Sequence, residues 1–215
     1  NSKNDKSEIL FRSFGRFVEG LGGRYITAED VGTSVKDMEI VRMETNYVTG
    51  ISRALGGSGD PSIVTAYGVY MGMKASVKYK LNRNSLNGLK IAIQGLGHVG
   101  MHLVDFLSKE DVQLFVTDID QESVEKVVTE YHAKPIELED IYSLDVDIFA
   151  PCALGAILND DTIPLLKCSI IAGASNNQLE KSHKHGIDIL ARGILFAPDY
   201  AINAGGLINV SNELE

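Results

Sequence analysis

Apolar residues in this chain follow two patterns that alternate from about residue 90 onward. Short apolar runs lie at residues 91–93, 112–116, 146–150, 169–172 and 193–196. After the first two runs, apolar residues recur at intervals of three and four, at Val99, Leu103, Phe106 and Leu107 and again at Val124, Val127, Val128 and Tyr131. Short runs predict buried strands, and the wider spacing predicts amphipathic helices. Their alternation predicts an α/β fold with a doubly wound, mostly parallel sheet.

The N-terminal part of the chain predicts helices joined by loops. A helix is expected where apolar side chains share one face, at Leu10, Phe14, Phe17, Val18 and Leu21. Tyr25 and Ile26 suggest a short strand, and a capping box that begins at Ser34 predicts a helix over residues 34–43. After a loop at 44–59, Asp60 and Pro61 start a helix that is apolar on nearly every side. We expect that helix to be buried.

The glycine motif that ends at Asp118 is the most specific feature of the sequence. Its turn lies between a strand and a helix and consists of Gly95, Leu96, Gly97, His98, Val99 and Gly100. Gly95 permits a tight turn, Gly97 lets the backbone approach a pyrophosphate, and Gly100 allows close helix packing. The pattern predicts a Rossmann-type dinucleotide site, with phosphates at the helix N-terminus and Asp118 on the adenosine ribose.

The residues around Asp118 bear on which cofactor binds. Asp120 adds a second carboxylate, and no arginine lies nearby in the sequence to hold a 2′-phosphate. We therefore expect NAD rather than NADP. The alternative is a glycine turn of an α/β sheet that binds no ligand.

Composition narrows the class of partner. The 215 residues carry a formal net charge of −9, which argues against nucleic acid and anionic membrane surfaces. No apolar run approaches the ~18 residues that span a bilayer. Cys152 and Cys168 are too few for a disulfide framework or a metal site, and we expect both to be core residues in a reducing cytoplasm. Small molecules and other subunits remain the expected partners.

Polar residues in three loops are candidates for chemistry. Asn176, Asn177 and Asn203 each follow a predicted strand, where ligands of an open parallel sheet bind, so they are candidates for the nicotinamide half. They could equally cap turns. Asp30 lies outside the dinucleotide fold and could exchange a proton with a substrate amine or hydroxyl, or it could simply start a turn.

The histidines do not suggest a metal. His98, within the glycine turn, is expected to be solvated or to lie beside a phosphate rather than to act in catalysis. The others show no metal-ligand spacing, and no metal is assigned to His102, His132, His183 or His185.

Several segments together resemble the glutamate/leucine/phenylalanine/valine dehydrogenase family, and within it the leucine dehydrogenases. They cover essentially the whole chain and are RFVEGLGGRYITAEDVGTSVKDM, GSGDPSIVTAYGVYMGMKA, QGLGHVG with VTDID, APCALGAILND, AGASNNQLE and APDYAINAGGLINV. The resemblance implies reversible NAD-dependent oxidative deamination of an L-amino acid to a 2-oxo acid and ammonia. It also implies a symmetric homo-oligomer, with octamers typical of leucine dehydrogenases.

The resemblance assigns roles to individual residues. Asp30 matches the family's catalytic aspartate, which handles protons at the substrate amine and the carbinolamine intermediate. Thr65 matches a threonine near the nicotinamide carboxamide, and Ala153 matches a residue on the adenosine side. Asn177 and Asn203 match asparagines around the nicotinamide and the substrate. The glycine turn and Asp118 match the family's pyrophosphate and ribose sites.

The matched side-chain pocket limits the substrate. Ala28, Leu207 and Val210 match this pocket, and all three are apolar. Burying an unpaired carboxylate against them would cost several kcal/mol, which excludes glutamate. An aliphatic branched-chain amino acid is expected. Leu207 stands where the family commonly has valine, so the choice among leucine, valine and isoleucine stays open, because one methylene discriminates by about 1 to 3 kcal/mol.

The resemblance also predicts how the chain is divided. Residues 1–49 would be a remnant of the substrate and oligomerisation domain, and residues 50–215 the NAD-binding domain. The chain starts at Asn1 without a methionine and ends in mid-pattern, so we expect a segment truncated at both ends. One extra residue relative to the family is expected in a loop over residues 181–185.

The family's catalytic lysine is the main departure. It lies in a GGGK motif upstream of the point that matches Asn1, as does the lysine that holds the substrate carboxylate, and no GGGK occurs in these residues. Lys3 and Lys6 do not replace it. We therefore expect the segment to bind NAD without turnover. The alternatives are a catalytically inactive NAD-binding module and another Rossmann enzyme, which would leave Asp30 unexplained.

Overall fold

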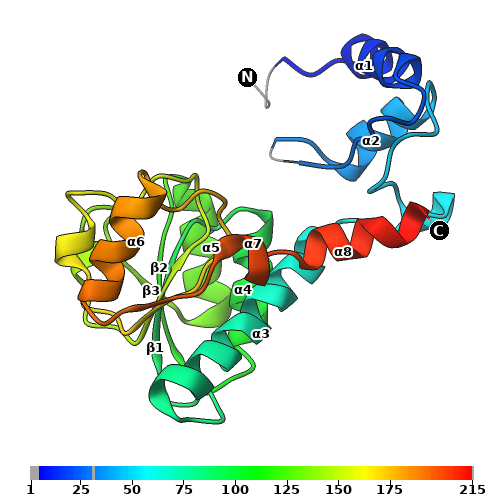
Figure 1. Ribbon diagram of the computed structural model, residues 1–215. Coiled ribbons are helices and arrows are strands. Elements are labelled where there is room, and N and C mark those ends of the chain that lie inside the picture. Colours follow the sequence, from blue (N-terminus) through cyan, green and yellow to red (C-terminus); the bar gives the residue numbers. More distant parts are fainter. Residues whose placement is uncertain (1–4, 31, 215) are drawn as a thin grey trace. The chain divides into compact units, whose positions relative to one another are not determined.

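The computed structural model describes residues 5–30 and 32–214, and the chain forms two compact units (Figure 1). Residues up to Pro61 and from Gly206 onward make the first unit, and Ser62–Gly205 make the second. The division therefore differs from the predicted boundary after residue 49. The segment before α3 and the end of the chain both join the first unit.

The first unit is helical. Its elements are α1 (Glu8–Gly20), α2 (Val35–Arg42), the 3₁₀ turn η1 (Arg53–Leu55), and at the end of the chain part of α8 (Gly205–Ser211) and η4 (Asn212–Leu214). Its buried residues are Phe11, Met38, Val41, Val48 and Ile51. A Cβ on Gly15 of α1 would lie 2.8 Å from the Val41 carbonyl oxygen of α2, so the glycine allows the two helices to pack closely.

Local sequence sets the ends of these helices. The Ser34 hydroxyl accepts the Asp37 N–H at the start of α2, which confirms the predicted cap. The predicted strand at Tyr25 and Ile26 is wrong, because the described backbone there makes only an isolated bridge between Thr27 and Val48.

Glu213 explains why residues beyond 49 join the first unit. Its carboxylate accepts the Gly50 N–H at 3.0 and 3.1 Å and the Ser58 N–H at 2.8 Å. Ile51 is 5% exposed and packs with the first unit's core. These contacts fix the segment ahead of α3 to residues near the end of the chain.

The second unit contains a six-stranded parallel sheet in the order β3-β2-β1-β4-β5-β6. The strands are β1 (Lys90–Gln94), β2 (Gln113–Thr117), β3 (Lys134–Pro135), β4 (Ile148–Pro151), β5 (Ile170–Ile171) and β6 (Leu195–Phe196). This is the strand order of the Rossmann fold, and it confirms the predicted fold class.

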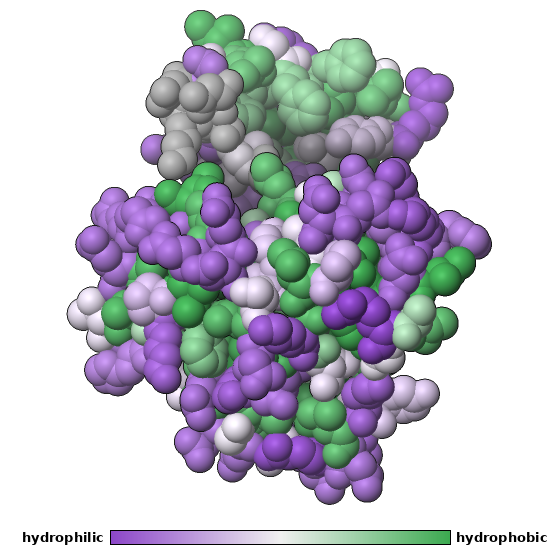
Figure 2. Space-filling model, turned by 90° about the vertical axis from the view of Figure 1, so that its left-hand side faces the viewer, coloured by the Kyte–Doolittle hydropathy of each residue, from purple (hydrophilic) through white to green (hydrophobic). Residues whose placement is uncertain are grey.

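Helices cover both faces of this sheet (Figure 1). α3 (Ser62–Leu81), α4 (His98–Leu107) and α5 (Gln121–Tyr131) share one buried cluster with Ile91 and Ile93 of β1. Ala92 faces the other cluster, which contains α6 (Ser182–Ala191) and the turns η2 (Asp140–Ser143) and η3 (Ile163–Leu165). The alternation along β1 is the period of two expected of a strand buried on both faces. The side that carries α6 is mostly hydrophilic at its surface (Figure 2).

Two expectations for helices fail. α3 is not buried on all sides, because Ile63, Tyr67 and Met71 are 45 to 49% exposed while Ala66 and Val69 are fully buried. Residues 182–185 begin α6, so the expected loop over 181–185 is also wrong. None of the described helices combines the length and apolarity that a membrane span requires.

Candidate functional site

The glycine turn connects β1 to α4 at the carboxyl edge of the sheet. Gly95 has φ 103°, and a Cβ on it would lie 2.6 Å from the backbone nitrogen of Ala153, so both conformation and space require glycine. A Cβ on Gly100 would lie 2.1 Å from the Gly95 carbonyl oxygen. Gly97 is different, because no atom lies within 4 Å of its Cβ position. The space beside Gly97 is therefore open, as a pyrophosphate contact requires.

The N-terminus of α4 can receive an anion. Gly97 is the N-cap and supplies no side-chain oxygen, and its carbonyl accepts the first helical bond from the Met101 N–H at 2.9 Å. The N–H groups of residues 98–100 have no partner within the helix, as at every helix start. Unpaired N–H groups and the helix dipole favour a phosphate. His98 is exposed beside them, as predicted.

Asp118 lies at the end of β2 and contacts the glycine turn. Its carboxylate accepts the Leu96 N–H at 2.5 Å and the Asp120 N–H at 2.8 Å. Two backbone donors fix the orientation of the carboxylate, and its remaining lone pairs can accept ribose hydroxyls. The acid that would bind ribose thus also holds the turn that would bind the pyrophosphate.

The predicted nicotinamide residues come from elements far apart in sequence. Asn203 follows α7 (Asp199–Ile202), and its Nδ2 donates to the Ala174 carbonyl at 3.0 Å and to Asn176 Oδ1 at 2.7 Å. Asn177 belongs to the same loop after β5. A Cβ on Gly205 would lie 3.4 Å from the Thr65 backbone nitrogen, which places the start of α3 against the end of α7. Thr65 and Asn203 therefore lie on adjacent segments, and Asn203 joins the loop of Asn177.

The residues predicted to handle substrate lie in the first unit. Asp30 is exposed, and its carbonyl accepts the Thr33 N–H at 2.9 Å, so it starts a turn as well as presenting a carboxylate. Val31 lies outside the described residues. Ala28 and Asp30 line a hollow of about 390 Å³ whose other walls are Phe11, Phe14, Tyr25, Ile26, Thr27, Glu29, Thr33 and Met38.

The other two pocket residues lie on α8. Val210 is 7% exposed and Leu207 is 73% exposed, and neither lines the hollow beside Asp30. The structure therefore brings Ala28 and Asp30 together but does not place the apolar trio in one pocket. Lys6 pairs with Asp37 at 2.5 Å, and Lys3 lies outside the described residues.

Two residues that contact the loop of Asn177 were not predicted to be part of the site. Gln178 is 1% exposed, and its Nε2 donates to the carbonyls of Gly173 and Ser175, both at 3.0 Å. Asp199 Oδ2 accepts the Asn177 N–H at 2.7 Å. Buried glutamine is uncommon, but the sequence alone gave no sign that Gln178 would be buried.

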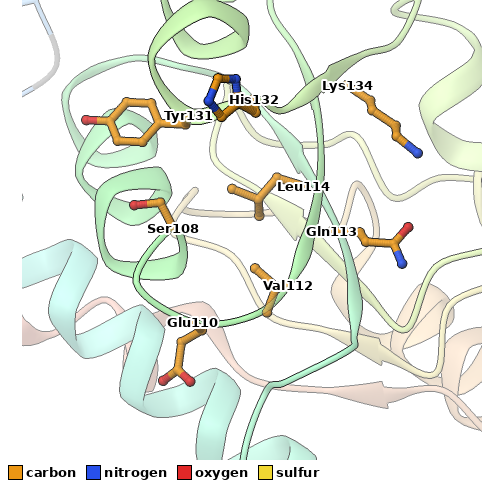
Figure 3. Close-up of a pocket in the computed structure, with 8 residues that line it drawn as sticks. All are labelled: Ser108, Glu110, Val112, Gln113, Leu114, Tyr131, His132 and Lys134. Carbon is orange, nitrogen blue, oxygen red and sulfur yellow. The ribbon is translucent and has the colours of Figure 1, made fainter.

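A cavity of about 180 Å³ lies at the opposite edge of the sheet (Figure 3). It is lined from the end of α4 and the turn after it, the start of β2, the end of α5 and the start of β3 by Ser108, Glu110, Val112, Gln113, Leu114, Tyr131, His132 and Lys134. Because β1 and β2 are parallel, this edge is the one from which the strands begin. The cavity is therefore separate from the glycine turn.

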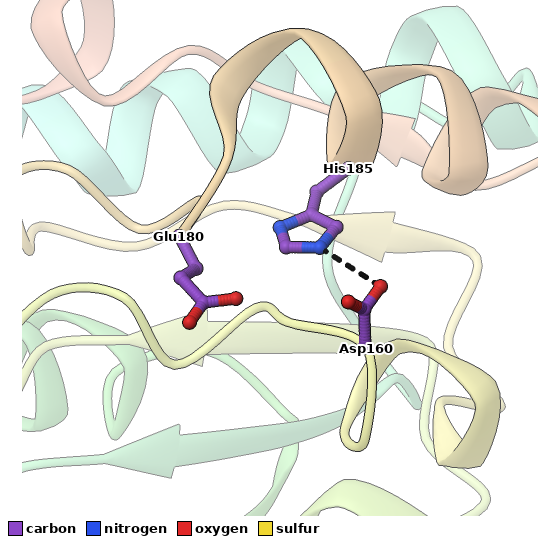
Figure 4. Close-up of side chains that lie close together, drawn as sticks. All are labelled: Asp160, Glu180 and His185. Carbon is purple, nitrogen blue, oxygen red and sulfur yellow. Dashed lines mark hydrogen bonds and ion pairs between the residues drawn. The ribbon is translucent and has the colours of Figure 1, made fainter.

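Asp160, Glu180 and His185 form a cluster that the spacing of histidines did not predict (Figure 4). His185 is fully buried, its Nδ1 accepts the Lys181 N–H at 3.0 Å, and its Nε2 lies 3.2 Å from Asp160 Oδ1. With Nδ1 accepting, the neutral ring carries its proton on Nε2 and donates to Asp160. Lys184 also binds Asp160. Both ring nitrogens are thus occupied, which favours an ion-pair network over a metal site.

The two cysteines are core residues, as predicted. Cys168 is buried, Cys152 is half-buried, and neither forms a disulfide. Burial raises the pKa of each thiol to about 11. Neither thiol is therefore a nucleophile near neutral pH.

Comparison with known proteins identifies relatives along the whole chain. Residues 113–215 match the family model of the glutamate/leucine/phenylalanine/valine dehydrogenases. The chain is 57% identical over 212 residues to a leucine dehydrogenase of Bacillus subtilis and 46% identical over 217 residues to a phenylalanine dehydrogenase of Bacillus thermotolerans, each alignment covering 99% of this chain. It spans 58% of the former's length and 56% of the latter's.

A solved structure agrees with these relatives. The crystal structure of L-tryptophan dehydrogenase from Nostoc punctiforme matches with a TM-score of 0.79 and 49% identity, over 98% of this chain and 60% of that chain. Amino-acid dehydrogenases with different named substrates are therefore similar to this chain in sequence and fold. Residues 113–215 belong to the glutamate/leucine/phenylalanine/valine dehydrogenase family, and the chain as a whole is homologous to its leucine dehydrogenases.

Proposed function

We propose that the whole protein catalyses NAD-dependent oxidative deamination of an aliphatic branched-chain L-amino acid to the 2-oxo acid and ammonia. The observation that carries the proposal is the glycine turn held to Asp118 through the Leu96 N–H, in a chain 57% identical to a leucine dehydrogenase. In this proposal the second unit binds the dinucleotide, and the first unit presents Asp30.

The surroundings of Asp118 support NAD as the cofactor. Asp118 is held by two backbone N–H groups, and Asp120 follows within the same turn. A 2′-phosphate at this position would meet two carboxylates, whereas ribose hydroxyls would donate to Asp118. NAD supplies the hydride acceptor when it is bound. The chain's own residues would hold its adenosine half at Gly97 and Asp118, and its nicotinamide half near Thr65, Asn177 and Asn203.

The proposed role of Asp30 is proton transfer at the substrate amine. Its exposed carboxylate lies at a hollow whose walls include Phe11, Phe14 and Met38. An acid in such a position can accept and return a proton during deamination, which contributes about 10²- to 10⁴-fold to the rate. Support for an aliphatic substrate comes from the resemblance, which matches the apolar Ala28, Leu207 and Val210 to the family's side-chain pocket, and not from the structure, which does not gather them in one hollow. Relatives of this chain also include dehydrogenases named for phenylalanine and tryptophan.

The test uses the full-length protein that contains this chain. NADH formation is followed with leucine, valine, isoleucine, phenylalanine, tryptophan and glutamate, each with NAD and with NADP. We expect a branched-chain substrate with NAD to be preferred. Asp30→Asn should lower kcat by about 100-fold or more while NADH still binds. Asp145→Asn, which alters a carboxylate whose side chain is 85% exposed, serves as the control and should leave both unchanged.

Other outcomes separate the parts of the proposal. Preference for glutamate would overturn the pocket argument, and preference for NADP would overturn the argument from Asp118. NADH binding without turnover of any amino acid would support the alternative function, a catalytically inactive NAD-binding module. A symmetric homo-oligomer, octameric by resemblance, is part of the proposal and is tested by light scattering of the same preparation.

A further inference from the structure

The single turn of α7 contacts the loop after β5 at two points. Asp199 and Asn203 are four residues apart and therefore lie on the same side of the turn. Asp199 Oδ2 accepts the Asn177 N–H at 2.7 Å, and Asn203 Nδ2 donates to Ala174 and Asn176. One of these two contacts is made by a predicted site residue. The other is made by Asp199, which no sequence motif singled out.

The backbone of Asn177 is held from two sides. Its N–H donates to Asp199, and its carbonyl accepts the Ala156 N–H at 2.7 Å. Asn177 has φ 53°, in the left-handed region that residues other than glycine and asparagine rarely adopt. Such a conformation persists where surrounding contacts hold it in place. The side chain of Asn177 is exposed, and its direction is set by this backbone conformation.

The position of α7 is itself fixed by close packing on α3. A Cβ on Gly68 would lie 2.7 Å from the Ile202 carbonyl oxygen, and a Cβ on Gly72 would lie 2.5 Å from Ile202 Cγ2. These two glycines leave a flat surface on α3 that allows Ile202 to approach. The Asp199 carboxylate is therefore held in place by the packing of α7, and the N–H that it accepts belongs to a backbone that is also held in place.

We infer that Asp199 is a positioning residue that holds Asn177 in its left-handed conformation and thereby directs the Asn177 side chain toward bound nicotinamide. The inference rests on the proposed function in one respect, namely that Asn177 faces the nicotinamide. Asp199 itself does not touch the reacting atoms in this scheme. What it contributes is the acceptor oxygen, because the bond to Asn177 needs one lone pair and no negative charge.

This distinction gives a matched pair of variants. Asp199→Asn keeps an acceptor oxygen at the same distance along the side chain, whereas Asp199→Ala removes it. Asn177→Gly removes the side chain but retains easy access to the left-handed conformation. If Asp199 acts through the Asn177 side chain, Asp199→Ala should have no further effect on turnover once Asn177 is glycine. Asp145→Ala, at an exposed carboxylate, controls for loss of charge.

The experiment measures amide hydrogen exchange, binding and turnover on the full-length protein. We expect Asp199→Ala to speed exchange at the Asn177 amide by about 10- to 100-fold and to lower kcat by about tenfold. Binding of ADP-ribose, which lacks nicotinamide, should be unchanged. Asp199→Asn should recover kcat to within about threefold of the wild type, since the acceptor remains.

Each remaining outcome has a defined meaning. Unchanged exchange in Asp199→Ala overturns the inference, as does an equal loss of kcat in the Asn177→Gly background or an equal loss of ADP-ribose affinity. Failure of Asp199→Asn to restore kcat would show that charge is required and would also overturn it. If the wild type neither turns over amino acids nor binds ADP-ribose, the proposed function fails. The exchange rate then decides alone whether Asp199 holds Asn177.

Discussion

The two ends of the candidate dinucleotide site depend on different groups: one mainly on the backbone, the other on polar side chains. The adenosine end uses backbone: the turn at Gly95, the helix start at Gly97 and the N–H of Leu96 bound to Asp118. The nicotinamide end uses side chains, in which Asp199 and Asn203 reach from α7 to the loop after β5. We expect the geometry of the adenosine end to be disrupted when a Cβ is added to a glycine of the turn. We expect the geometry of the nicotinamide end to be disrupted when a polar side chain is removed or when α7 moves.

Sequence separation distinguishes the two ends as well. The strand, turn, helix and acid of the adenosine end lie within residues 90–118, and only Ala153 comes from elsewhere. The nicotinamide end requires α3, the loop after β5 and α7 to meet, and these elements are spread from Ser62 to Asn203. A site assembled from distant elements depends on how well each of them packs. Its geometry is therefore the more sensitive to substitutions away from the ligand.

The largest expected effect is at the adenosine end. Gly95→Ala places a Cβ 2.6 Å from the Ala153 nitrogen and forces alanine to adopt φ 103°. The clash is with the backbone of the turn after β4. Neither that turn nor β1 can move away without breaking hydrogen bonds of the sheet. We expect the free energy of unfolding to fall by about 3 kcal/mol or more, with loss of dinucleotide binding. Urea denaturation measures the former, and an unchanged denaturation midpoint would contradict the close approach.

The geometry of the glycine turn and of the helix after it could be predicted from sequence because its causes are local. The glycines, the helix spacing after them and Asp118 act within one strand-helix-strand unit, and the same holds for Ser34 at the start of α2. The strands predicted at residues 91–93 and 146–150 fall on β1 and β4 because a short apolar run is a local pattern, although the two strands pair with each other across the chain.

The rest could not be predicted because it depends on partners distant in sequence. Nothing near Asp199 indicates that its carboxylate accepts the N–H of Asn177. β3 consists only of Lys134 and Pro135, both exposed, so it has no hydrophobic pattern to detect. α3 has an apolar pattern all round, but its burial depends on which neighbours cover it. His185 likewise meets Asp160 only because α6 packs beside the turn before η3.

The next largest expected effect concerns the packing of α7 against α3. Gly68→Ala brings a Cβ to 2.7 Å from the backbone oxygen of Ile202, so α7 must shift. We expect kcat of the full-length protein to fall by about tenfold or more, because Asn203 moves with α7, while ADP-ribose binding is retained. Steady-state kinetics and a separate binding titration measure the two quantities.

Gly72→Ala provides the matched control. Its Cβ would meet the Ile202 side chain at 2.5 Å rather than the backbone, so shortening that side chain can relieve part of the clash. Ile202→Ala should therefore improve turnover in the Gly72→Ala background and have little effect in the Gly68→Ala background. Equal rescue in both backgrounds would argue against the backbone contact and weaken the contrast between the two ends.

A smaller effect, on binding alone, is expected at Gly97. No atom lies within 4 Å of its Cβ position, and its φ of −69° suits any residue, so Gly97→Ala should leave the free energy of unfolding within about 0.5 kcal/mol of the wild type. The added methyl group would instead occupy the space proposed for the pyrophosphate. We expect affinity for NADH and for ADP-ribose to fall by about tenfold. Unchanged affinity for both would place the phosphates elsewhere.

The smallest effect concerns a contact that joins the elements of the two ends. Tyr70 and Lys74 of α3 donate hydrogen bonds to Glu110, which lies in the turn that leads into β2. These bonds hold the pKa of the Glu110 carboxyl below its usual value of 4.5, although partial burial opposes them. Because the pKa of Glu110 is lower in the folded state, the contribution of these bonds to the free energy of unfolding is complete above pH 4.5. It is lost as the pH falls through the folded pKa.

Glu110→Gln tests this contact. We expect the free energy of unfolding at pH 7 to fall by about 1 kcal/mol, and the difference from the wild type to shrink steadily as the pH is lowered below 4.5. Asp105→Asn removes the exposed pair with Lys109, whose side chains are 43% and 65% exposed, and should show a smaller and flatter difference. A Glu110→Gln deficit that persists unchanged in acid would mean that the contact acts by packing, because protonating the carboxylate would then cost nothing.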